Sequence, residues 1–255
     1  MFKRIKHVFT ADKGSSIENE SGQGAQSGSA TAGRVSTTRA GPEWAGLQGL
    51  SCTLEAGEGA FCVHGELAGQ PWRLERAPAS RDYLVGEELR GRSELGISGQ
   101  VTVVLMNRPL KETLEKRAYS LYTDTLETQV SPVLTEEMRW LALYPEAGWD
   151  SLSDAFLHRY AILAERRADA MRWLTPELVD LLMGWPEPAP DNSVPFILML
   201  MRGKAHLRMQ ALPYAGASDV AADLPAQIHA VRLLVSASEL AVAAFPDVAP
   251  DSLKK

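Results

Sequence analysis

The chain has 255 residues, of which 45% are hydrophobic and 23% charged, and its formal net charge is −6. This length and composition suit one buried core, and the acidic balance disfavours nucleic acid, because phosphate is bound mainly by Lys and Arg. The densest apolar run, Val194 to Met201, is too short to cross a bilayer. Two cysteines are too few for a disulfide scaffold. We therefore expect a cytoplasmic protein.

Residues 1–45 are predicted to form a disordered tail ahead of a single α+β domain over 46–255, which could divide into subdomains near residue 145. The segment from Gly14 to Gly41 consists mostly of Gly, Ser, Ala and Thr, so it cannot bury enough apolar surface to offset its ordering entropy. It should act as a flexible tether.

The first nine residues, "MFKRIKHVF", differ from the tether because they combine apolar and basic side chains. On a helix, the apolar members would share one face beside a cluster of positive charge. This pattern predicts docking to a partner protein or peripheral contact with the inner membrane, and a translation-start segment without a role remains open. The residues concerned are Phe2, Lys3, Arg4, Ile5, Lys6 and Phe9.

The first half of the domain reads as a β-meander followed by helices. Alternation of apolar and polar residues predicts strands at Leu50–Glu55, Ala60–Leu67 and Trp72–Glu75, and a buried strand at Gln100–Met106. A helix is expected from Arg108, with Leu110, Leu114, Ala118 and Leu121 on its apolar face. A second helix should begin after Thr135, which has the residue type of an N-cap.

The division of the second half of the domain into elements depends on the N-cap of one helix. Thr175-Pro176-Glu177 has the form of an N-cap, a first-turn proline and an acidic residue, so a helix should begin at Pro176. The preceding residues then divide into a strand, "RYAILAE", and a short helix, "RRADAMRWL". A hairpin should turn around Arg202-Gly203-Lys204. A final helix is expected over 224–245, with its core face formed by Ile228, Val231, Val235, Val242 and Phe245.

The segment from Trp149 to Phe245 resembles the C-terminal α+β domain of an uncharacterised bacterial membrane-anchored family. The matching features are Trp149-Asp150, Phe156, Ala168-Asp169-Ala170 and Leu174-Thr175-Pro176. The resemblance implies an α+β fold, but no activity is established for the family, so it implies no substrate and no catalytic residue. Members of that family carry transmembrane helices, whereas this chain has only its short basic tip.

An arginine-rich stretch between residues 72 and 96 is the most distinctive local composition. Five arginines could converge on a phosphate or carboxylate, since guanidinium groups bind these anions in a bidentate way. Alternatively, Arg90 and Arg92 lie at helical spacing from Glu87, Glu88 and Glu94, which would allow self-neutralisation along a helix face. The candidate anion site consists of Arg73, Arg76, Arg81, Arg90 and Arg92.

Other chemistry-bearing residues give weaker signals. Cys52 and Cys62 are expected on neighbouring strands, where burial is favoured over a disulfide or, with His64, a metal site. We expect no metal and no cofactor. Three histidines fall in separate predicted elements, and two acidic residues are interpreted as turn or cap residues. These are His158, His206, His229, Asp150 and Asp154.

No phosphate-binding loop, zinc-protease motif or nucleophile elbow occurs in the sequence. The leading hypothesis is therefore a non-enzymatic bacterial interaction or assembly protein, tethered through its tail to a membrane surface or a larger complex. The alternative is an enzyme or small-ligand sensor that binds an anion through the Arg73–Arg92 region.

Overall fold

The computed structural model describes residues 51–54, 61–128, 134–187, 189–211 and 219–246. The chain divides into two units, Met1–Val35 and Ser36–Lys255, and every described residue lies in the second. The predicted disordered tail, its basic tip and the predicted domain start near residue 46 lie outside the described residues. The described part is an α+β fold, as the sequence predicts.

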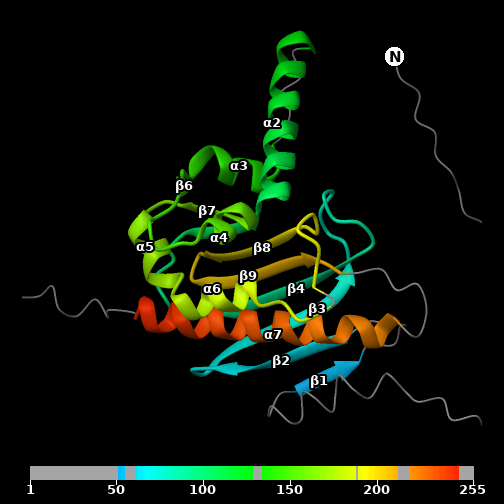
Figure 1. Cartoon of the computed structure of the whole chain (residues 1–255), viewed down its shortest axis with the longest axis vertical. Helices are drawn as coiled ribbons and strands as arrows, with labels where there is room; N and C mark the ends of the chain where they lie inside the picture. The colour runs from blue at the N-terminus through cyan, green and yellow to red at the C-terminus, as the bar shows by residue number, and fades with distance from the viewer. Residues whose placement is uncertain (1–50, 55–60, 129–133, 188, 212–218, 247–255) are drawn as a thin grey trace, which may run out of the picture. The chain divides into compact units, whose positions relative to one another are not determined.

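In the described part of the chain, nine strands form one sheet in which every pairing is antiparallel, in the order β1-β2-β3-β4-β9-β8-β5-β7-β6 (Figure 1). The N-terminal strands follow one another in space as a meander. The C-terminal hairpin then inserts between the meander and the central strands. The strands are β1 (Ser51–Leu54), β2 (Phe61–Leu67), β3 (Gln70–Pro78), β4 (Glu87–Glu94), β5 (Val103–Asn107), β6 (Glu146–Ala147), β7 (Tyr160–Ala164), β8 (Phe196–Met201) and β9 (Lys204–Gln210).

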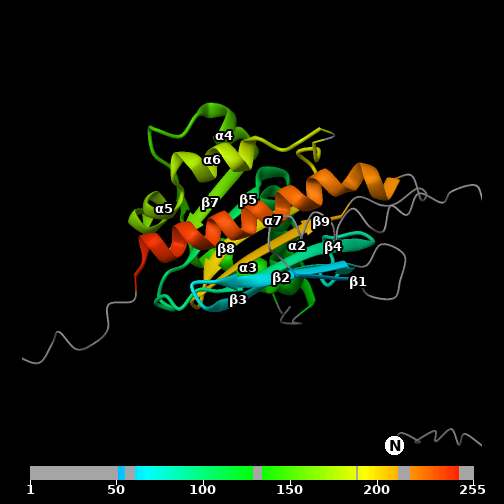
Figure 2. The same ribbon diagram turned by 90° about the horizontal axis from the view of Figure 1, so that it is seen from below.

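Helices cover the two faces of the sheet unequally. One face, which we call the covered face, carries the larger core and packs against α4, α5, α6 and the long α7, which runs along the strands in both views (Figures 1 and 2). The other face, the open face, is packed by α2 and α3 around β5, β7 and β8. The described helices are α2 (Arg108–Thr128), α3 (Glu136–Leu143), α4 (Asp154–Arg159), α5 (Arg167–Trp173), α6 (Pro176–Met183) and α7 (Asp219–Ala244).

The cap-based division of the second half is confirmed. The side chain of Thr175 accepts a hydrogen bond from the backbone N–H of Leu178 at 3.4 Å, and Pro176 occupies the first turn of α6. Strand β7 and helix α5 precede it, as expected. The predicted cap at Thr135 is confirmed in the same way, through the N–H of Met138.

The final helix begins earlier than predicted, at Asp219, and Pro225 lies inside it. Its core face was also only partly predicted. Val231 and Phe245 are buried, whereas Ile228, Val235 and Val242 are half-buried. Small residues and Leu234 dominate the buried face instead, because α7 approaches the sheet closely at Gly91. The fully buried positions in this part of the helix are Ala230, Leu233, Leu234, Ala237, Ser238 and Ala241.

Candidate functional site

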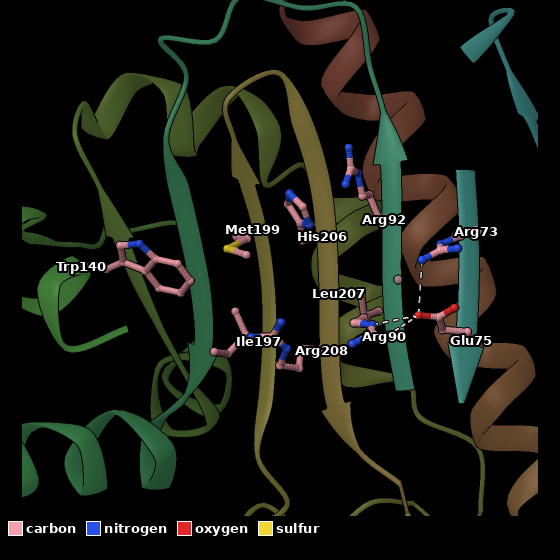
Figure 3. A pocket seen from close by; sticks show the side chains of 11 residues that line it. Arg73, Glu75, Arg90, Arg92, Trp140, Ile197, Met199, His206, Leu207 and Arg208 are labelled. Atoms are coloured by element: carbon pink, nitrogen blue, oxygen red, sulfur yellow. Dashed lines mark hydrogen bonds and ion pairs between the residues drawn. The ribbon is translucent and has the colours of Figure 1, made fainter. Parts of the chain in front are cut away.

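A shallow basin of about 200 Å³ lies on the open face, where two rows of side chains cross β3, β4, β9 and β8 (Figure 3). We call it the arginine basin. In the first row, Arg73 faces Arg92, Arg92 faces His206, and His206 faces Met199. The second row crosses the same four strands in the same order and consists of Glu75, Arg90, Arg208 and Ile197. The lining is completed by Trp140 of α3, Gly91 and Leu207.

The basin follows from period-2 alternation along its strands. In β9, Ala205, Leu207 and Met209 are buried in the core of the covered face, and the intervening positions are only partly buried. Strand β3 alternates in the same way around Trp72 and Leu74. Successive side chains of a strand point to opposite faces, so the antiparallel register aligns the polar positions of neighbouring strands. The polar rows are therefore a property of sheet register, assembled from segments far apart in the sequence.

Like charges face each other twice in the basin. Arg73 is opposite Arg92, and Arg90 is opposite Arg208. Directly opposed like charges destabilise a sheet unless other groups neutralise them. The lining contains four arginines and a single carboxylate, Glu75.

The two arginine pairs are neutralised to different degrees. Arg90 Nη2 lies 2.5 Å from Glu75 Oε1, and Arg90 Nη1 lies 3.4 Å from Glu88 Oε1. In the other pair, the side chains of Arg73 and Arg92 remain 60% and 50% exposed. Arg73 Nη2 lies 3.5 Å from Glu75 Oε1, which is a weak ion pair. Arg92 Nη2 lies 2.6 Å from Glu94 Oε1 at the rim of the basin. Arg73 and Arg92 are therefore the most exposed cations of the basin lining.

Two carboxylates with almost no exposed side chain, Glu88 and Glu137, lie beside the basin and hold Arg208 in place. Arg208 Nη1 donates to Glu137 Oε1 at 3.2 Å. Its Nε faces Glu88 Oε2 at 3.3 Å, but the geometry is not that of a hydrogen bond, so both atoms are buried without a described hydrogen-bond partner. Burial and the Glu137 charge raise the pKa of Tyr83, whose hydroxyl donates to the same carboxylate.

His206 is the titratable base of the lining. Burial, and then the positive charges of Arg92, Arg208 and Lys204, lower its pKa from 6.5 to about 4. The ring is therefore neutral at physiological pH and can donate one hydrogen bond and accept another. It adds polarity to the middle of the basin without adding charge.

The structure brings together three of the five arginines of the predicted anion site, namely Arg73, Arg90 and Arg92. Arg76 lies three positions after Arg73, so strand alternation turns it to the covered face, where it is 3% exposed and pairs with Glu87. Arg81 lies in the loop between β3 and β4 and donates to Glu137 at 2.7 Å. The prediction that all five arginines converge on one anion site is therefore wrong.

The alternative of ion pairs along a helix is also wrong, because residues 87–94 form strand β4. Arg90 and Arg92 pair with Glu88 and Glu94, two positions away on the same face of the strand, and Arg90 pairs across strands with Glu75. Sequence reasoning missed Arg208 and Trp140 as members of the site. The alternation of "KAHLRMQ" would have placed His206 and Arg208 together on one face.

The three histidines are separate, as predicted. His158 is exposed on α4, and His206 lies in the basin. His229 is buried on α7, with its Nε2 2.9 Å from the Leu181 carbonyl and its ring 4.5 Å from that of Trp185. Asp154 lies in the first turn of α4, which Ser153 caps, and Asp150 lies in a turn.

Cys52 and Cys62 lie on the neighbouring strands β1 and β2, as expected, but not directly opposite each other, because Cys52 pairs in register with Val63, and Cys62 with Thr53. Among the residues that the structure describes, no group of three His, Cys, Asp or Glu side chains is placed to hold a metal ion. No helix in this part of the chain is both long and apolar enough to span a membrane. The tip residues proposed for docking lie outside the described residues.

Comparisons with known proteins do not show a family for this chain. No protein-family profile and no curated protein matches the chain. One solved structure, the mycobacterial trehalose monomycolate transport factor A (TtfA), aligns with 84% of this chain and 99% of its own at 11% identity and a TM-score of 0.43. These values establish neither a shared fold nor a shared function. The bacterial membrane-anchored family of the sequence resemblance stays a prediction.

Proposed function

We propose that the protein is a non-enzymatic binding module whose arginine basin binds an anionic group, a carboxylate or a phosphate, on a partner. The observation that carries this proposal is the opposition of Arg73 and Arg92, two half-exposed arginines on neighbouring strands. Directly opposed like charges destabilise a sheet, and the carboxylates of Glu75 and Glu94 neutralise this pair only in part. An anion between the two guanidinium groups converts the repulsion into a pair of charge-assisted hydrogen bonds.

Binding is favoured over catalysis by the titration properties of the lining. Guanidinium groups keep their protons at neutral pH, so the arginines cannot transfer one. His206, with a pKa of about 4, is far from the neutral range in which a general base is effective. The only lining carboxylate, Glu75, is held by Arg90 at 2.5 Å. These groups are suited to holding a charge rather than to moving a proton.

The proposal keeps the tail as a tether. Residues 1–45 would hold the domain near the inner membrane or a larger cytoplasmic complex, with Phe2, Ile5 and Phe9 contributing apolar contacts and Lys3, Arg4 and Lys6 contributing charge. Co-sedimentation with anionic and neutral liposomes tests the membrane form. Loss of binding to anionic liposomes after joint Phe2→Ala and Ile5→Ala substitution is the expected result. Equal binding to both liposome types contradicts it.

The basin is tested by thermal shift at low salt against citrate, inorganic phosphate, nucleotides and an acidic peptide. We expect at least one anion to raise the melting temperature by several degrees, and the joint variant Arg73→Gln/Arg92→Gln to remove the rise. Arg166→Gln is the matched control, because Arg166 is 58% exposed and pairs with Asp169 at 2.8 Å away from the basin. A rise that survives in the joint variant, or no rise with any anion, contradicts the proposal.

A shift with nucleotides or phosphorylated metabolites alone would favour the alternative, a small-ligand sensor or enzyme that uses the same arginines. A shift with the peptide favours an interaction protein. The same panel therefore separates the two functions.

A further inference from the structure

The arginine basin changes from basic to apolar along its length. Arg73 and Arg92 lie at one end, on β3 and β4, while Met199 of β8 and Trp140 of α3 lie at the other, with neutral His206 between them (Figure 3). An inorganic anion would use only the basic end. The gradient fits a ligand that presents a negative group and an apolar group at a fixed separation.

The volume of the basin limits the size of the ligand that it can hold. Pockets that enclose drug-sized molecules have volumes of about 300–1,000 Å³. The basin, at about 200 Å³, is smaller and lies on an open sheet face. It has room for one or two side chains of a larger molecule, which is how protein interfaces use a pocket to receive an anchor residue.

The net charge of the protein further limits the kinds of partner that the basin can bind. A net charge of −6 repels polyanions such as nucleic acid at long range, and it repels a segment with a single carboxylate much less. In addition, α3 rises from the open face beside the basin, since Trp140 forms part of the lining. A flat lipid surface would meet this helix first. A protruding polypeptide segment would not.

We propose that the basin docks an extended acidic segment of a partner protein, with one carboxylate held between Arg73 and Arg92 and one apolar side chain against Met199 and Trp140. This proposal rests on the proposed anion-binding function and names its partner. Neighbouring strands are about 4.8 Å apart, so the point between Arg73 on β3 and Arg92 on β4 lies two and a half strand spacings, roughly 12 Å, from Met199 on β8. Side chains four residues apart in an extended segment share one face at about 13 Å. The segment therefore carries Glu or Asp at one position and an apolar residue four positions away.

Selection from a random dodecapeptide library on the full-length protein tests this spacing without assuming a partner. We expect peptides with an acidic and an apolar residue four positions apart to be enriched. Enrichment should vanish when the same selection is made on Arg73→Gln/Arg92→Gln. Enriched peptides without the acidic residue, without the apolar residue or with an arbitrary spacing between the two overturn the proposal.

The affinities of an enriched peptide and its variants then test the docking of a segment separately from the binding of an anion. Replacing its acidic residue by Gln, or its apolar residue by Ser, should each weaken binding about tenfold, as expected for loss of one anchor. Met199→Gln should remove the effect of the apolar replacement but keep that of the acidic one. The peptide replacements decide the result even where Met199→Gln fails to fold.

Three further outcomes are distinct. Dependence on the acidic residue alone overturns the docked segment but leaves anion binding standing. Binding of inorganic phosphate or of phosphatidylglycerol vesicles through Arg73 and Arg92, with no peptide enriched, does the same and identifies the source of the anion. Binding of none of these probes overturns both proposals.

Discussion

Leu234 of α7 occupies the space that a side chain on Gly91 of β4 would need. A Cβ added to Gly91 would lie 2.8 Å from Leu234 Cδ2 and 3.2 Å from Leu207 Cβ. Both leucines are buried in the core of the covered face, so neither has free room to move. This contact sets the distance between α7 and the strand that carries Arg90 and Arg92.

Gly91→Ala should therefore destabilise the fold by about 1–3 kcal/mol, the usual cost of overpacking a core. Urea denaturation gives the free energy of unfolding. Leu234→Val shortens the side chain that the new methyl group meets, so it should cost less in the Gly91→Ala background than in the native chain. Additive costs in the double variant would show that the two residues are not in conflict.

Thr175→Ala should lower the free energy of unfolding by about 1 kcal/mol, because the N-cap oxygen that accepts from Leu178 is lost. Thr113→Ala is the control. Thr113 is exposed within α2 and donates to the Pro109 carbonyl, so its replacement should be neutral or slightly stabilising. Binding to the basin should change in neither variant. Equal destabilisation by both would contradict a specific capping role.

Glu137→Gln should destabilise the protein by roughly 3–5 kcal/mol, because the carboxylate is 1% exposed and neutralises Arg81 and Arg208. Its sequence neighbour provides the control. Glu136 is 38% exposed and lies 3.8 Å from Arg81, so Glu136→Gln should cost less than about 1 kcal/mol. Thermal and urea unfolding of the pair measure the difference. A similar cost for both would mean that burial does not strengthen the Glu137 interactions.

The stability of the protein should fall as the pH drops through the range in which His206 titrates. Its pKa is lowered from 6.5 to about 4 in the folded protein by burial and by neighbouring cations. Below 6.5 the unfolded chain therefore takes up a proton that the folded protein does not, and stability decreases from pH 6.5 down to about 4.

His206→Gln should reduce this loss, measured as the difference in unfolding free energy between about pH 7 and about pH 5. Part of the loss should remain, because burial also lowers the pKa of His229. An anion bound in the basin would offset the nearby cations and raise the pKa of His206, which an NMR titration would detect. An unchanged pH dependence in His206→Gln would contradict the assignment.

Arg73→Gln should leave the free energy of unfolding unchanged or raise it by up to about 1 kcal/mol at low salt, since it relieves the repulsion from Arg92. Arg90→Gln should instead destabilise by about 1–3 kcal/mol, because Glu88, which has no exposed side chain, loses a partner. Both variants should weaken anion binding. Destabilisation by Arg73→Gln comparable to that of Arg90→Gln would assign Arg73 a structural role.

Local signals in the sequence predicted much of the fold. The cap at Thr175, the turn at Arg202-Gly203 and the apolar stripe of α2 depend on neighbouring residues alone, and each is confirmed. Strand β4 was missed, because "EELRGRSE" places opposite charges at spacings that suit a helix as well as a strand. Its decisive partners, Glu75 and Arg208, lie on strands whose position depends on the whole sheet.

The candidate site was predicted only in part for the same reason. Arg73, Arg90 and Arg92 were identified from composition, but a stretch of sequence does not show which face of a sheet each side chain occupies. The odd spacing of Arg73 and Arg76 would have separated them once β3 was accepted as a strand. Arg208 and Trp140 enter the basin through contacts between distant segments, for which no local pattern exists.

The position of the C-terminal hairpin in the sheet has a consequence for synthesis on the ribosome. Because β8 and β9 lie between β4 and β5, the strands made earlier cannot join into one sheet until residue 210 has emerged. Until then, β4 and β5 each present an edge of unpaired N–H and C=O groups, and β5 is apolar over most of its length. Nascent chains that stall or end before Phe196 consist of two unfinished half-sheets. These are the species that chaperones must protect from edge-to-edge association.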